Sequence, residues 1–563
     1  MEFLDWLVIA VFTAALVGIV VWVVRQKNDN SADYFLGGKD ATWIAIGASI
    51  FASNIGSEHL IGLAGAGASS GMAMAHWEIQ GWMILILGWV FVPFYSRSMV
   101  YTMPEFLERR YNSQSRIILS VISLISYVLT KVAVTVYAGG LVFQQVFGIK
   151  ELWGIDFFWI AAISLVVITA LYTVLGGMKS VLYTSVLQTP ILLLGSLIIL
   201  VLGLKALGSW DQMMQLCDVK PAYEGAQGTM IHLMRSNSDP QYPWLGALIG
   251  SAVIGFWYWC TDQFIVQRVL SGKNERESRR GTIFGAYLKL LPVFLFLIPG
   301  MIAFALHQKY AADGGFLPLM ANGLPNADAA FPTLVAKLLP AGVKGLVVCG
   351  ILAALMSSLA SLFNSSAMLF TIDFWKRLKP QTSEKNLVRI GQIATVVIVV
   401  LGILWIPIMR SVGDVLYTYL QDVQSVLAPG IAAAFLLGVC WKRASARGGQ
   451  WGLLSGIIIG LTRLGAKIYY SNTPDAADSW FKSVFYDYNW LFFCGTMLAV
   501  CCLVVIIVSL CTPAPDPQKI RGLVFGTSTP EQRAATRASW NGWDVFHTII
   551  ILGITVAFYI YFW

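Results

Sequence analysis

The chain has 563 residues, of which 57% are hydrophobic and 12% are charged, and its formal net charge is +8. So few charged residues exclude a water-soluble globular protein, in which about 25% of the residues are charged. The basic excess does not require a nucleic-acid partner, because these residues lie in short loops, where they orient membrane helices. The apolar stretches are continuous runs of about 20 residues, which favours membrane helices over a β-barrel.

Hydropathy and length predict an all-α polytopic membrane protein with about 14 transmembrane helices. The first span is too long for a signal-peptide core, so we expect it to be retained. An orientation with the N-terminus and the C-terminus outside places most loop Lys and Arg residues on one face, which the positive-inside rule assigns to the cytoplasm. The expected spans are 3–24, 43–70, 72–97, 116–147, 154–176, 180–204, 241–270, 281–306, 342–374, 388–409, 411–440, 448–470, 487–511 and 543–563.

Between these spans lie two long outer loops, 205–240 and 307–341, and a polar inner linker, 512–541. None of these segments is long enough to act as an enzyme module. The aqueous loops also contain no nucleophile–base pair and no metal-binding cluster, so we do not expect an enzyme. The compact loops favour a bacterial inner membrane.

The second span contains a helix that is easily interrupted. Its middle is small and polar, with Ser53, Asn54, Gly56 and Ser57 close together. Where a membrane helix unwinds, its carbonyl groups lose their partners, which is tolerable only if they line a cavity or hold a cation. We therefore predict a sodium ion at this break and a small hydrophilic solute on the neighbouring polar side chains. The alternative is a packing seam of small residues between helices.

Several strongly polar side chains lie within predicted spans, where each needs a partner. An interfacial position would explain Glu78 alone, and snorkelling to the inner surface would explain Lys289 alone, whereas Lys131 lies deeper. In the seventh span, the aromatic run 257–259 precedes Asp262 by three residues. Sugar rings stack their C–H faces on aromatic planes, and their hydroxyls need polar partners at the edge. The alternative for the aromatic run is a belt at the bilayer interface.

The ninth span carries serines at helical spacing. Ser357, Ser361 and Ser365 share one face, and Ser358 lies beside the first of them. Hydroxyl oxygens suit a hard cation such as sodium, although a serine in a membrane helix can instead bond to its own backbone. Paired serines that face a broken helix favour the cation site.

These motifs resemble those of the sodium/solute symporter family, and within it the sodium/glucose cotransporters of bacteria and animals. The resemblance covers residues 30–540 and is collinear along the chain. The matching stretches are DYFLGGK at 33–39, the break at 47–65, MPEFL at 103–107, WYWCTDQ at 257–263 followed by VQR at 266–268, YLKL at 287–290, and SSLASLFNS at 357–365.

The resemblance implies the leucine-transporter type of fold, a 5+5 inverted repeat with broken helices. The two repeats would be spans two to six and spans seven to eleven. The division it implies is a first peripheral transmembrane helix in 1–30, the first repeat in 43–204, an extracellular loop in 205–240, the second repeat in 241–440, and C-terminal peripheral helices in 441–563 that include the cytoplasmic linker 512–541.

The resemblance also implies the site residues. Sodium would be bound by the carbonyls of Ala52, Ile55 and Ala354 and the hydroxyls of Ser357 and Ser358. The sugar site would comprise Asn54, His59, Glu78, Lys289 and Gln421, with Trp259 as a stacking platform. The inner gate would be Tyr258, and the outer gate would consist of Leu63, Trp77 and Tyr417.

Two departures from the family pattern bear on stoichiometry. Members that carry two sodium ions have Asp where this chain has Ser185 and Thr where it has Ala360. Without that carboxylate and that hydroxyl, a second sodium site is poorly provided for. We therefore expect one sodium ion per sugar.

The expected function is sodium-coupled symport of a monosaccharide of the glucose or galactose type into the cell, by alternating access. Sodium would be the coupling ion, with no organic cofactor and no nucleic-acid partner, and the lipid bilayer would surround the protein. The alternatives are a sodium symporter for another solute, such as myo-inositol or another hexose, and a sensor that binds sodium and sugar but transports little. The sequence leaves the oligomeric state open.

Overall fold

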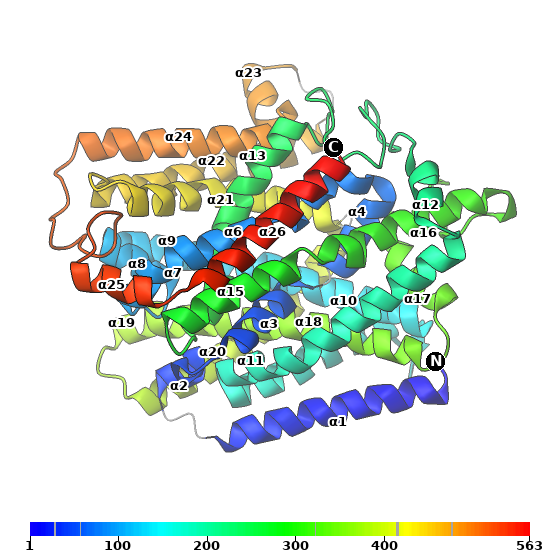
Figure 1. Cartoon of the computed structure of the whole chain (residues 1–563), viewed down its shortest axis with the longest axis horizontal. Helices are drawn as coiled ribbons and strands as arrows, with labels where there is room; N and C mark the ends of the chain where they lie inside the picture. The colour runs from blue at the N-terminus through cyan, green and yellow to red at the C-terminus, as the bar shows by residue number, and fades with distance from the viewer. Residues whose placement is uncertain (27–29, 57, 321–322, 413–415, 474–476) are drawn as a thin grey trace.

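The computed structural model describes residues 1–563 apart from 27–29, 57, 321–322, 413–415 and 474–476 (Figure 1). The described chain is mostly helical, as predicted. Its only strands are β1 Glu151–Leu152 and β2 Ile155–Asp156, which pair antiparallel. Helices dominate because a spanning segment in hydrocarbon must satisfy its backbone hydrogen bonds internally.

Eleven helices among the described residues are long and apolar enough to cross a bilayer, and three shorter apolar helices accompany them. The expected number of about 14 spans is therefore not confirmed. One reason is that the spans expected at 154–176 and 180–204 form a single element, α11 Phe157–Leu207. Its two halves meet at Gly177, whose φ of 56° and ψ of −145° favour glycine. A side chain there would collide with the carbonyl oxygen of Tyr34.

The N-terminal part consists of a first membrane helix, a short helical segment and then the elements of the first predicted repeat. Three of its expected spans contain π-helical turns, where the regular hydrogen-bond ladder is interrupted. The elements are α1 Phe3–Arg25, α2 Ser31–Leu36, η1 Gly37–Lys39, α3 Trp43–Asn54, η2 Glu58–Leu63, α4 Ala64–Ser69, η3 Gly71–Met74, α5 Ala75–Glu78, α6 Gly81–Ile86, η4 Leu87–Phe91, α7 Val92–Ser98, α8 Met103–Arg110, α9 Ser113–Ser126, η5 Tyr127–Val132, α10 Ala133–Phe147 and α11.

The loop after α11 contains one short helix, and the second predicted repeat follows it. Its first helix is again interrupted near the middle, between η6 and α14. The elements are α12 Trp210–Cys217, α13 Trp244–Gly255, η6 Phe256–Thr261, α14 Gln263–Leu270, α15 Glu275–Lys289, η7 Val293–Leu297, α16 Ile298–Lys309, η8 Ala311–Asp313, η9 Ala327–Ala329, α17 Ala330–Leu338, α18 Val343–Met368, η10 Leu369–Trp375, α19 Lys376–Leu378, α20 Glu384–Val412 and α21 Leu416–Cys440.

The C-terminal part adds two long helices, which pack against α21, and a final helix, which packs against α6 and α15. In Figure 1 the short helix α25 of the linker lies at the end of the molecule opposite the N-terminus. The elements are α22 Ala446–Asn472, α23 Trp480–Lys482, η11 Ser483–Asp487, α24 Trp490–Leu510, α25 Pro530–Ala538 and α26 Gly542–Tyr561.

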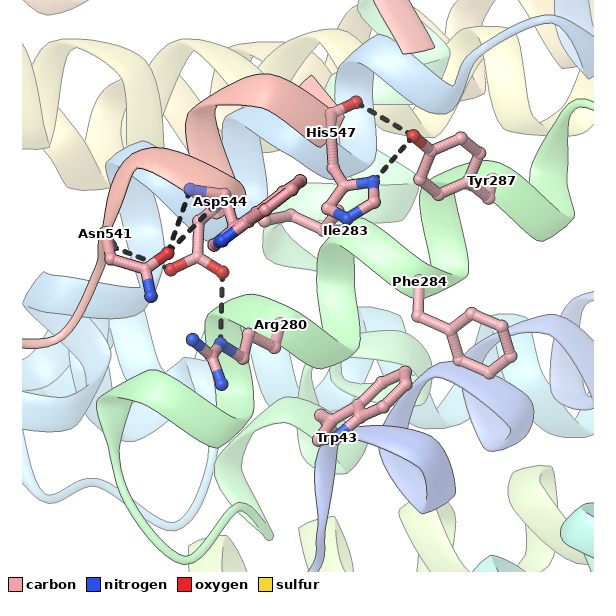
Figure 2. A pocket seen from close by; sticks show the side chains of 9 residues that line it. Trp43, Arg280, Ile283, Phe284, Tyr287, Asn541, Asp544 and His547 are labelled. Carbon is pink, nitrogen blue, oxygen red and sulfur yellow. Dashed lines mark hydrogen bonds and ion pairs between the residues drawn. The ribbon is translucent and has the colours of Figure 1, made fainter. Parts of the chain in front are cut away.

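The final helix, α26, packs along α6 and α15. At its start, Asp544 Oδ1 accepts from Arg280 Nε at 3.0 Å, and one turn later His547 Nδ1 lies 3.0 Å from the hydroxyl of Tyr287. Figure 2 shows these pairs beside a groove of about 610 Å³ that is also lined by Trp43 and Phe284. Polar contacts near its start therefore fix α26 against α15.

Candidate functional site

The first broken helix is interrupted at the position that the sequence predicts. Helix α3 ends at Asn54, Ile55 has extended backbone (φ −80°, ψ 110°), and the next helical turn begins at Glu58. Asn and Gly are poor helix formers, which explains why the helix stops here. The last four carbonyl groups of a helix have no intrahelical partner. The predicted ligands Ala52 and Ile55 thus lie where carbonyl oxygens are available.

The serine face of α18 lies against this break. The hydroxyl oxygens of Ser53 and Ser361 are 2.6 Å apart, so a hydrogen bond joins the end of α3 to α18. Ser361 lies one turn beyond Ser357 and Ser358, and all three serines are buried. Ala354, the remaining predicted ligand, lies one turn earlier on α18 and is also buried. The fold therefore brings the two parts of the predicted sodium site onto adjoining helices.

The hydrogen bonds around Ser357 leave its oxygen lone pairs for a cation. Its hydroxyl lies 3.2 Å from that of Ser185, and Ser185 donates its own proton to the carbonyl of Val181 at 2.7 Å. Because a hydroxyl has one proton, Ser357 donates in the contact with Ser185, and its lone pairs are left for a cation. The family resemblance implies Asp at the position of Ser185 in two-sodium members, and a carboxylate there would lie next to this predicted ligand.

Four of the predicted sugar-binding side chains, Asn54, His59, Glu78 and Lys289, form one buried polar network. Lys289 Nζ lies 2.5 Å from Glu78 Oε2 and donates to Asn54 Oδ1 at 3.2 Å. His59 Nε2 lies 3.3 Å from the same Glu78 oxygen, and Asn54 Nδ2 donates to the hydroxyl of Tyr258 at 3.2 Å. Glu78 and Lys289 are 2% and 3% exposed. At these exposures neither side chain reaches the surface of the protein, so Lys289 does not snorkel and Glu78 does not face the bilayer interface.

The network lines a cavity of about 50 Å³. Among the described residues the amide oxygen of Gln421 has no hydrogen-bond partner, and this buried oxygen belongs to a side chain that lines the cavity from α21. Trp259 is 2% exposed, and its ring centre lies 5.3 Å from Lys289 Nζ. The arrangement thus offers donors, acceptors and an aromatic face within one enclosure, which is what a polyhydroxylated ring requires.

Two of the predicted gate residues, Trp77 and Tyr258, line this cavity. Trp77 lines it and stacks on Trp490, with ring centres 5.6 Å apart, while Leu63 is fully buried at the end of η2. The side chain of Tyr417 lies outside the described residues. Tyr258 lines the sugar cavity and also a second cavity of about 30 Å³, which is bordered by Ser358. Tyr258 therefore lies between the predicted sugar site and the space next to the predicted sodium site.

Three polar lining residues were not among the predicted site residues. Glu58, Gln80 and Gln424 all line the sugar cavity. Gln424 lies three residues after Gln421 and shares its helical face, which is a signal that spacing alone provides. Gln80 accepts from Trp259 Nε1 at 3.3 Å and so fixes the ring that the sequence singled out. Its partner is 179 residues away, a pairing that the sequence does not reveal.

Comparisons with known proteins identify the family of the chain. The sequence model of the sodium:solute symporter family matches residues 34–456. The chain is 35% identical over 557 residues to sodium/glucose cotransporter 4 of Danio rerio, covering 96% of this chain and 84% of the relative. It is 36% identical over 542 residues to sodium/myo-inositol cotransporter 2 of Homo sapiens, covering 93% and 79%.

Among solved structures, the chain is similar to a Na⁺-coupled sialic acid symporter in a substrate-bound outward-open state. The TM-score is 0.71 with 21% sequence identity, and the match covers 92% of this chain and 99% of that one. At this identity the likeness shows a common fold and does not extend to the substrate.

Proposed function

The chain belongs to the sodium:solute symporter family, a family of transporters rather than enzymes, and we propose that it carries sodium and a neutral sugar-like solute into the cell together. The buried Glu78–Lys289–Asn54 network beside Trp259 is the observation that supports a neutral polyol. Glu78 would repel an anionic solute. Hydroxyl groups, by contrast, can donate to Glu78 and accept from Lys289 without adding charge.

The preferred solute is a monosaccharide of the glucose or galactose type, with myo-inositol as the second candidate. The names of the relatives support both, since one is a sodium/glucose and the other a sodium/myo-inositol cotransporter. Both solutes are rings with several hydroxyls, and the described residues offer the same partners to each. A sensor that binds without transporting is the candidate of another class.

Sodium would be bound by the carbonyls of Ala52, Ile55 and Ala354 with the hydroxyls of Ser357 and Ser358. Coupling follows from the covalent position of Asn54, which ends α3 next to Ile55 and also donates to Tyr258. An ion that holds these carbonyls orders Asn54, and an ordered Asn54 lowers the entropic cost of binding the solute. By linkage, the solute strengthens sodium binding by the same factor.

Transport would proceed by alternating access between the gates. Leu63, Trp77 and Tyr417 would close over the bound solute, and Tyr258 would then move to release it. We also propose that 43–204 and 241–440 are the halves of an inverted repeat, which is supported by the broken helices that begin both. Termini on the outside and a bacterial inner membrane remain proposals, and the named relatives are animal proteins.

One sodium ion per solute gives a limited driving force. A tenfold sodium gradient supplies about 1.4 kcal/mol, and a potential of 100 mV about 2.3 kcal/mol per charge. Their sum of about 3.7 kcal/mol permits the solute to accumulate at most a few-hundred-fold. This suffices to scavenge a dilute sugar.

The predicted stoichiometry can be measured from reversal potentials in proteoliposomes. With Ser185 and Ala360 at the positions where two-sodium members carry Asp and Thr, we expect a sodium-to-solute ratio of one. A ratio of two would contradict this prediction. The matched variant Ser185→Asp with Ala360→Thr supplies both missing ligand groups and is the comparison to measure beside the wild type.

The proposed function itself is tested by measuring uptake into proteoliposomes along an inward sodium gradient. Proteoliposomes with the purified chain are offered radiolabelled glucose, galactose, mannose, fructose and myo-inositol in turn. We expect at least one of them to accumulate above its external concentration. A sensor would bind the solute without accumulating it, and this result would favour the sensor over the symporter as the function of the chain.

A further inference from the structure

A buried lysine outside the proposed binding sites is enclosed by aromatic rings. Lys131 lies in the π-helical turn η5 and is 9% exposed. Its Nζ lies 2.7 Å from Asp262 Oδ2, and Asp262 is 4% exposed. An ammonium group over a ring face is attracted by the ring quadrupole, and more strongly when both are desolvated. The ring centres lie at 4.7 Å for Tyr258, 4.7 Å for Phe264, 5.1 Å for Tyr127 and 5.3 Å for Trp257.

This lysine lies on the side of Tyr258 that faces away from the sugar network. Lys131 and Thr135 line the 30 Å³ cavity, together with Ser358, and neither lines the sugar cavity. Tyr258 lines both cavities. The proposed inner gate is therefore held from two sides. Asn54 donates to its hydroxyl from the sugar side, and the ammonium group contacts its ring from the other side.

The contacts join two segments that are distant in sequence. Lys131 and Asp262 are 131 residues apart, and Asp262 forms the break between η6 and α14. Tyr127, one turn before Lys131, donates to Asp262 Oδ1 and accepts from the amide of Phe264 at 3.1 Å. Tyr258 lies only four residues before Asp262 on the same broken helix. A displacement of Tyr258 that carries the break with it must therefore break the ion pair and the aromatic contacts together.

We propose that Lys131 is a positioning residue that latches Tyr258 in the closed position through Asp262 and the surrounding rings. The proposal rests on the proposed function in one respect, namely that Tyr258 is the inner gate. Lys131 does not line the sugar cavity, although it borders the 30 Å³ cavity together with Ser358 and Gln421. In this proposal it sets how often the path below Tyr258 opens. Loss of its charge favours the inward-open state.

The test measures the opening of that path directly. A cysteine replaces Thr135, which lines the 30 Å³ cavity, in a chain whose exposed Cys440 and Cys511 are changed to serine. A membrane-impermeant thiol reagent is added on the cytoplasmic side of inside-out vesicles. We expect Lys131→Met, which keeps the side-chain length and removes the charge, to raise the labelling rate at least tenfold. Lys131→Arg should stay within threefold of the starting chain.

A second variant, Asp262→Asn, tests the same ion pair in case Lys131→Met does not fold. Asp262→Asn removes the counter-charge and retains a residue that caps helix N-termini as well as Asp does. It should raise the labelling rate as Lys131→Met does, and the double variant should add little to either. The control, Lys482→Met, breaks an exposed ion pair with Asp478 and should change nothing.

The outcomes separate the latch from the transport function. Labelling needs neither sodium nor solute, so a faster rate supports the latch whichever solute is carried. Folded Lys131→Met and Asp262→Asn chains that label at the starting rate would overturn the latch while leaving sodium-driven uptake untouched. If Lys131→Met does not fold, Asp262→Asn decides by the same criterion. If neither variant folds, the pair supports the fold and is not a latch, which also overturns the proposal.

Discussion

Replacing Glu78 by glutamine is expected to raise the solute concentration for half-maximal uptake at least 100-fold at saturating sodium. Glu78 Oε2 lies 2.5 Å from Lys289 Nζ and 3.3 Å from His59 Nε2, and the pair is buried. Removing one partner of a buried ion pair leaves an uncompensated charge, at a cost of about 3–5 kcal/mol. Each solute hydroxyl that loses its partner costs a further 1–3 kcal/mol, roughly.

Two further variants separate binding from stability in this experiment. Glu78→Gln with Lys289→Met removes both charges, so thermal stability should recover while solute affinity stays low. Asp478→Asn removes a carboxylate from an exposed ion pair and should leave uptake unchanged. Solute affinity at the wild-type level in a folded Glu78→Gln chain would remove Glu78 from the proposed sugar site.

Replacing Ser358 by alanine should raise the sodium concentration for half-maximal uptake about tenfold or more, since a lost polar partner costs about 1–3 kcal/mol. Solute affinity at saturating sodium should change less than threefold. Ser358 borders the 30 Å³ cavity beside the α3 break and does not line the sugar cavity. The effects on sodium binding and on solute binding should therefore separate. Both constants come from uptake measured over a grid of sodium and solute concentrations.

Ser366→Ala is the matched control for this substitution. Ser366 lies on the same helix, is fully buried, and its hydroxyl has no hydrogen-bond partner among the described residues. We expect its sodium dependence to equal that of the wild type. Should Ser358→Ala and Glu78→Gln weaken sodium and solute binding alike, the assignment of two separate sites would be wrong.

Local features of the sequence predicted the elements of the site better than their pairing. The run around Asn54 and Gly56 predicted the interrupted helix because these residues are poor helix formers at membrane depth. An interfacial position could explain Glu78 alone and snorkelling could explain Lys289 alone, because the sequence does not show that these residues, 211 positions apart, are partners. Only the fold shows that each is the other's counter-charge.

The number of spans and the latch were harder to predict for the same physical reason. Hydropathy separates 154–176 from 180–204, but it cannot show that Gly177 lets one helical element turn between them. Lys131 and Asp262 both stood out as charges in apolar surroundings. The aromatic enclosure that unites them depends on rings from two distant segments, Tyr127 among them, and so on tertiary packing. The roles of individual binding residues came from the family resemblance.

The central claim is that solute accumulation is driven by a sodium ion bound where the broken helix α3 meets the serines of α18. Its most direct test is uptake of the accumulated solute into proteoliposomes, with an inward gradient of either sodium or choline at equal ionic strength and membrane potential. With sodium, the internal concentration should exceed the external one at least tenfold, and with choline the two should equalise. Equal accumulation with both cations would contradict the account.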